Sequence, residues 1–147
     1  MTTPHNIEIF NETVGKTLAF LYESFPRRTS FNVSQLTGIP APSMDEEKQA
    51  RIEKIRALEL RYYSIAWLVD SGYISAKPFP YDEFHDAVLT AKGLEVLKFE
   101  PESLKTSFGD KLLDASKNSA SEVLKSTTSS LLTAGATFAI NHLLFKS

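Results

Sequence analysis

The chain has 147 residues, of which 42% are hydrophobic, and this suits one ordinary globular domain with a substantial core. Its formal net charge of −2 argues against a sequence-blind nucleic-acid binder, although it leaves room for a local basic face. The chain contains no cysteine, which excludes disulfides, thiolate metal sites and cysteine nucleophiles. Its first residues lack the basic and then apolar segments of a secretory signal, so we expect a cytoplasmic protein.

The first third of the sequence predicts two helices joined by a short segment. Apolar residues recur at spacings of three and four over residues 7–24, which indicates one face of a helix. Residues 27–31 are expected to form an extended or turn segment. Either Asn32 or Ser34 can cap a helix of little more than one turn over residues 32–38.

The longest predicted helix covers residues 44–71. Asp45, Glu46 and Glu47 would occupy its first turn, where the helix dipole favours negative charge. Gly72 is well placed to end it. One buried stripe is expected to contain Ile52, Ile55, Leu58, Tyr62, Ile65, Ala66 and Val69.

The remaining residues predict a hairpin and further helices. Residues 73–77 and 84–89 are the expected strands, and Thr90 is expected to cap a helix that follows them. The segment 102–147 differs in composition, being rich in Ser, Thr, Ala and Leu, and predicts one or two helices.

Two stretches of this sequence carry a resemblance to a known family. The long helix ends in LVDSGYI and the hairpin ends in AVLTAKG, after the order helix, short helix, long helix, strand, turn, strand. Over about residues 7–100, this resembles the winged helix–turn–helix domains of bacterial regulators such as the MarR-like and PadR-like families. The resemblance implies an α+β, mostly α fold, with a winged-helix domain over 5–100 that has a two-stranded wing and a helical C-terminal extension over 102–147.

What the resemblance implies about function is a small, non-enzymatic regulator that binds DNA as a dimer. In such domains the third helix enters the major groove and the wing contacts the backbone. Carried over, the DNA-binding residues would be Arg27, Arg28, Lys48, Arg51, Lys54, Arg56 and Lys77. The charge pattern is mixed, however, because acidic residues precede the long helix and lie in the hairpin turn. A solvated helix face with i,i+4 ion pairs explains the charges of residues 45–61 equally well.

A protein-interaction module, of the antitoxin, immunity or adaptor type, is the alternative. Aromatic residues inside a charged rim are a common way to build a protein interface. Here the surface would be an acidic, aromatic wing that suits a basic partner. Its residues would be Phe79, Tyr81, Asp82, Glu83 and Phe84.

The C-terminal stretch 126–145 has no Asp, Glu, Lys or Arg. Its length is that of a membrane span, yet its Ser and Thr content favours packing or dimerisation over membrane association. The spacing of Gly135 and Ala139 is that of close helix pairs. The expected homodimer helix would use Leu131, Leu132, Gly135, Phe138, Ala139 and Leu143.

No catalytic constellation is evident in the sequence. The three histidines, at positions 5, 85 and 142, have no partner at metal-ligand spacing, and the six glycines form no phosphate-binding loop. We therefore expect no enzymatic activity, no catalytic or metal-binding residues and no cofactor.

Overall fold

The computed structural model describes the backbone of residues 3–145 and the side chains of residues 3–137. The fold is α+β and mostly helical, with a small antiparallel sheet. The described elements are α1 (His5–Ser24), β1 (Thr29–Asn32), α2 (Val33–Thr37), α3 (Lys48–Asp70), β2 (Ile74–Phe79), β3 (Glu83–Leu89), α4 (Ala91–Lys98), α5 (Phe108–Lys117) and α6 (Ser121–Phe145).

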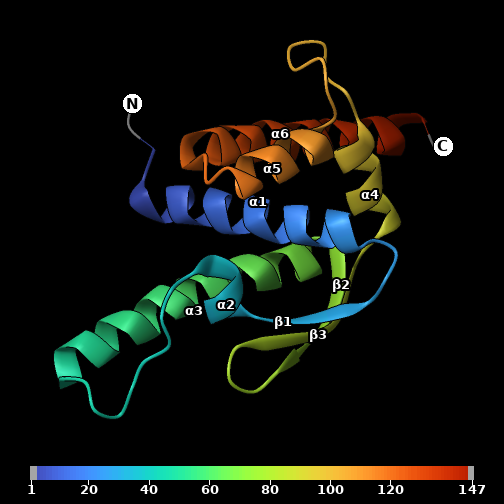
Figure 1. The fold of residues 1–147 in the computed structure, drawn as a ribbon. Helices are drawn as coiled ribbons and strands as arrows, with labels where there is room; N and C mark the ends of the chain where they lie inside the picture. The colour runs from blue at the N-terminus through green and yellow to red at the C-terminus, as the bar shows by residue number, and fades with distance from the viewer. Residues whose placement is uncertain (1–2, 146–147) are drawn as a thin grey trace.

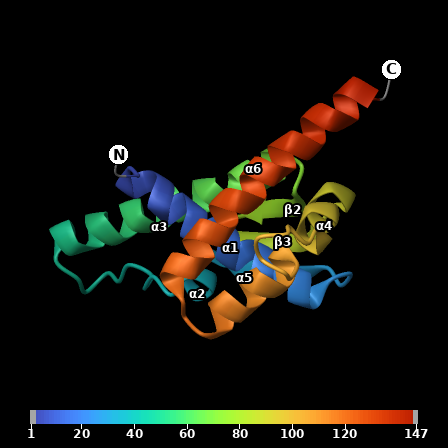
Figure 2. The same ribbon diagram turned by 90° about the horizontal axis from the view of Figure 1, so that it is seen from above.

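Helix α1 lies in the middle of the molecule, between the C-terminal helices and the rest of the fold (Figures 1 and 2). Helices α5 and α6 pack on one side of it, and α3 and the sheet lie on the other. Leu18 of α1, Phe84 of β3 and Leu131 of α6 belong to the same hydrophobic core. The C-terminal helices therefore complete the core of the fold, as a packed layer.

The sheet has three strands in the order β1-β3-β2, whereas the sequence predicted two. The segment predicted as extended or turn forms β1, which pairs with β3 and places Phe31 opposite Phe84. The two rings stack with centroids 5.5 Å apart, and both are buried. Burial of this aromatic pair stabilises the pairing of the short segment with β3.

Helix α3 begins at Lys48, so the prediction that three acidic residues occupy its first turn is wrong. Glu46 is instead held in the preceding loop, where its carboxylate accepts hydrogen bonds from the backbone N–H of Ser43 and from Nζ of Lys54. The predicted buried stripe is also interrupted, because Ile55 is 46% exposed. The stripe fails here because the N-terminal half of α3 extends beyond the rest of the fold (Figure 1).

The predicted helix ends are confirmed at three places. The side chain of Asn32 caps α2 by accepting hydrogen bonds from the backbone N–H groups of Ser34 and Gln35. Gly72 follows α3 with φ of +80°, a left-handed conformation that favours glycine. The side chain of Thr90 caps α4 by accepting from the N–H of Gly93.

Part of the uncharged stretch of α6 packs against the core of its own chain. Leu131 is fully buried, and a Cβ on Gly135 would overlap the hydroxyl of Tyr73. Leu132 is partly buried against the same core. Of the expected dimer residues, Phe138, Ala139 and Leu143 lie outside the residues whose side chains are described. Among the residues that the structure describes, no helix combines the length and the apolar character needed to cross a membrane.

Candidate interaction surface

The N-terminal half of α3 projects from the molecule (Figures 1 and 2). None of its residues from Lys48 to Ala57 is buried, and the first buried side chain is that of Leu58. An ion pair between Lys54 Nζ and Glu46 Oε1, 2.7 Å apart, connects the preceding loop to α3. The hydrogen bond from Lys54 is the main cause that lowers the pKa of Glu46 below its usual value. The projecting helix is therefore braced by the loop that precedes it.

A groove lies between this helix, the preceding loop and the tip of the hairpin. It has a volume of about 240 Å³. Its apolar walls come from Pro42 of the loop and from Ile55, Leu58, Tyr62 and Tyr63 of α3. Two carboxylates, those of Glu59 on α3 and Asp82 in the hairpin turn, also line it. The groove is therefore apolar and aromatic, with negative charge and no lysine or arginine among its lining residues.

Large apolar side chains are exposed in this groove and in the two segments that border it. Ile55 is 46% exposed, Tyr63 is 61% exposed, and Met44 in the adjoining loop is 86% exposed. Tyr81, which precedes Asp82 at the hairpin turn, is 87% exposed. Exposed large apolar residues that gather around one hollow mark a candidate interaction site.

The hairpin carries a second aromatic feature further along. Phe79 is 45% exposed and stacks on the ring of His85, with centroids 3.8 Å apart. The His85 ring is in turn hydrogen-bonded to Glu83 at 3.1 Å. Phe84 does not belong to this surface, although the sequence suggested it. Its side chain is fully buried between the rings of Phe31 and Tyr62, so it serves the core.

Two of the cations expected to contact DNA lie together at the hairpin, where they face an acid. Lys77 Nζ is 3.4 Å from Oδ2 of Asp86, and Arg28 Nη1 donates to the backbone carbonyl of the same residue at 3.3 Å. The carboxylate of Asp86 offsets one of these two positive charges. Arg27, which precedes β1, is exposed.

The cations of α3 do not share one face. Successive residues of an α-helix are rotated by about 100°, so Lys54 and Arg56 point roughly 160° apart. Lys48, Arg51 and Lys54 fall within an arc of roughly 120° and Arg56 lies outside it, but Lys54 is already paired with Glu46. A single DNA groove can therefore meet three of these four side chains.

Of the residues that line the groove, Asp82 belongs to the interaction surface predicted from the sequence, whereas Ile55, Leu58 and Tyr62 were expected in a buried stripe. One signal was present, since Tyr62 and Tyr63 are adjacent on a helix and cannot both face the core. The contribution of Pro42 and Asp82 depends on how the loop and the hairpin fold back toward α3, which no local pattern specifies.

Comparison with known proteins gives no independent guide to function. No family model, no curated protein and no solved structure matches this chain. Within the part of the chain that the structure describes, no three His, Cys, Asp or Glu side chains are grouped as metal ligands.

Proposed function

We propose that this chain is a winged-helix protein that uses the groove between α3 and the hairpin tip to bind another protein. Apart from the additional strand β1, the order of its elements up to β3 follows the order that supports the winged-helix resemblance. On this assignment α3 is the third helix and the β2–β3 hairpin is the wing. The projecting half of α3 and the wing tip then form one binding surface.

The groove is the observation that carries this proposal. Its apolar walls and exposed aromatic neighbours provide what protein interfaces use as anchors. Its carboxylates, Glu59 and Asp82, select against an anionic partner and favour a cationic one. The expected partner is therefore a segment that presents a large apolar side chain next to lysine or arginine.

A peptide-display selection tests this proposal without knowledge of the partner. A random peptide library is selected on the full-length protein and then measured against the Ile55→Ser/Tyr63→Ser variant, whose altered side chains are exposed. Val123→Ser serves as a control because Val123 is 39% exposed on α6 and lies outside the groove. We expect enriched peptides to combine an aromatic or aliphatic anchor with a basic residue, and to lose at least tenfold in affinity for the double variant only. Acidic peptides, or peptides unaffected by the double variant, would exclude the proposal.

DNA binding is the second candidate, and one observation favours it. Among the described residues, Lys48, Arg51 and Arg56 of the projecting half of α3 form no ion pair within 4.0 Å. Their positive charge is therefore open to a phosphate backbone, which supplies much of the affinity for DNA. The acidic wing opposes this use, because Asp82, Glu83 and Asp86 would approach the same polyanion.

Fluorescence anisotropy distinguishes this second candidate. A labelled random duplex and fragments from upstream of the gene are titrated at low and physiological salt. DNA binding predicts an affinity that falls steeply with salt and that Arg51→Ala and Arg56→Ala weaken. Lys98→Ala, a charge-matched change at an exposed position on α4, should leave it unchanged. No binding at low salt would remove this candidate.

We also propose that the chain forms a homodimer through the C-terminal part of α6. This part of the helix extends beyond the other elements in Figure 2. Leu131 and Gly135 are buried within their own chain and are therefore not available for a contact between copies, which we place nearer the C-terminal end.

A further inference from the structure

A second cavity, of about 340 Å³, lies among α1, α2, α5 and the start of α6. Its apolar lining includes Phe20, Leu36, Leu113 and Leu124. Three of these side chains pack against the hydrophobic core, and Leu124 belongs to it. This volume is at the lower end of the range for small-molecule pockets, which suits a ligand of few atoms.

The same cavity is lined by two pairs of opposite charges. Lys16 and Glu12 form one pair on α1, with Nζ and Oε1 3.4 Å apart, and both side chains are largely covered. Lys117 and Glu23 form the other pair, 3.1 Å apart and more exposed. The four groups sum to no net charge, so the cavity favours a ligand that carries both signs.

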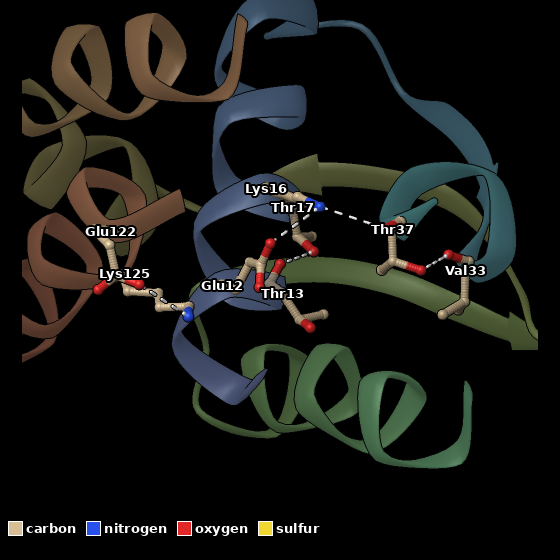
Figure 3. Close-up of polar contacts among 8 residues, drawn as sticks. All are labelled: Glu12, Thr13, Lys16, Thr17, Val33, Thr37, Glu122 and Lys125. Atoms are coloured by element: carbon tan, nitrogen blue, oxygen red, sulfur yellow. Dashed lines mark hydrogen bonds and ion pairs between the residues drawn. The ribbon is translucent and has the colours of Figure 1, made fainter. Parts of the chain in front are cut away.

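Lys16 is held loosely enough to accept a further partner. Figure 3 shows its ammonium group between the carboxylate of Glu12 and the backbone carbonyl of Thr37. The contact to Thr37 is 3.3 Å long, and both contacts exceed the roughly 2.7–2.9 Å of strong charge-assisted hydrogen bonds. An ammonium group has three N–H donors, and these two contacts occupy two of them.

From this arrangement we infer that the cavity binds a small zwitterion, an α-amino acid with an apolar side chain. The ligand carboxylate pairs with Lys16 and its ammonium group pairs with Glu12, which places two opposite charges against two opposite charges. Phe20 follows Lys16 by one turn of α1, and Leu36 lies across from it on α2, so the ligand side chain is received by the apolar lining.

Titration of the full-length protein with L-phenylalanine, followed by amide NMR shifts, tests this inference. We expect saturable shifts at residues around Lys16, Leu36 and Ala120, all of which line the cavity. Two analogues separate the charges: 3-phenylpropionate lacks the ammonium group and phenethylamine lacks the carboxylate. Each should bind at least tenfold more weakly. Equal binding of either analogue, shifts confined to other regions, or no saturation below about 20 mM would overturn the inference.

Two variants locate the site independently. Lys16→Met keeps the apolar stem of the side chain and removes its charge, and Glu12→Gln keeps the shape and removes the opposite charge. Each should weaken L-phenylalanine binding at least tenfold. Lys98→Met, on α4 and outside the cavity lining, should not change it. If Glu12→Gln and any folded Lys16→Met protein bind L-phenylalanine as the wild type does, the site is elsewhere and the inference fails.

Discussion

Thr90 is joined to Tyr73 through both its backbone and its side chain. The backbone N–H of Thr90 donates to the carbonyl oxygen of Tyr73 at 3.1 Å, and the single hydroxyl proton of Thr90 lies between the carbonyl oxygens of Gly72, at 2.5 Å, and Tyr73, at 3.0 Å. The hydroxyl oxygen also accepts from the N–H of Gly93 at 3.1 Å. The first turn of α4 is thus fixed directly to the residue that precedes β2, and this accounts for Thr90 and Gly93 in the sequence Leu-Thr-x-Lys-Gly at the end of β3.

This junction predicts that Gly93 cannot be replaced even by alanine. A Cβ at this position would overlap the backbone carbonyl of Tyr73, which cannot move without breaking the junction. We expect Gly93→Ala to lower the free energy of unfolding toward the upper end of about 1–3 kcal/mol, despite the better helix propensity of alanine. Urea denaturation measures this. The control, Glu95→Ala on the exposed face of α4, should change it by less than about 0.5 kcal/mol.

The hairpin provides a matched pair of aromatic residues with opposite environments. Phe84 is fully buried in the core, whereas Phe79 is 45% exposed. Phe84→Ala should therefore lower the free energy of unfolding by about 3–5 kcal/mol. Phe79→Ala, which removes a ring stacked on His85 at the surface, should lower it by less than about 1 kcal/mol. Similar losses for the two variants, measured by urea denaturation, would contradict the observed packing.

Tyr73 predicts a loss of stability at alkaline pH. Burial raises the pKa of its phenol above the usual 10.0. The folded state then holds this proton more tightly than the unfolded state, so the contribution is complete below pH 10.0 and is lost as pH rises through the raised value. We expect the urea midpoint to fall less above this pH in Tyr73→Phe than in the wild type. Tyr81→Phe, at a position 87% exposed, should behave as the wild type does.

The proposed dimer predicts that oligomeric mass depends on the end of α6. A chain that ends at Thr137 retains Leu131 and Gly135, which pack within the monomer, and should remain folded by circular dichroism. We expect light scattering to give twice the chain mass for the full-length protein and a single chain mass after this truncation. A full-length monomer, or a truncated chain that stays dimeric, would exclude a dimer built through this segment.

The elements that the sequence predicted well are those fixed by local chemistry. Asn32 and Thr90 are caps because their side chains reach backbone N–H groups two or three residues ahead, and Gly72 adopts a left-handed conformation that favours glycine. Such contacts depend on a few adjacent residues. Their positions could therefore be predicted without knowledge of the tertiary structure.

The errors arose where distant segments meet. Phe84 was predicted at the surface because it is an aromatic residue in a hairpin. The pairing of β1 with β3 instead stacks it on Phe31 in the core. Ile55 fits the helical periodicity of its neighbours, yet it lies in the half of α3 that no other element covers fully. Helix α3 begins at Lys48 and not at the predicted residue 44. The carboxylate of Glu46 contacts Lys54, eight residues later, and helix-dipole reasoning does not include that contact.

The most direct test of the central claim is to reverse the charge of the groove. Binding of a display-selected basic peptide and of a random DNA duplex is measured on the wild type and on the Glu59→Lys/Asp82→Lys variant. The groove proposal predicts that the wild type binds the peptide, that the variant binds it at least tenfold more weakly, and that the wild type has no salt-sensitive affinity for DNA. A peptide affinity unchanged by the reversal, together with salt-sensitive DNA binding by the wild type, would contradict the claim and assign the surface between α3 and the β2–β3 hairpin to nucleic acid.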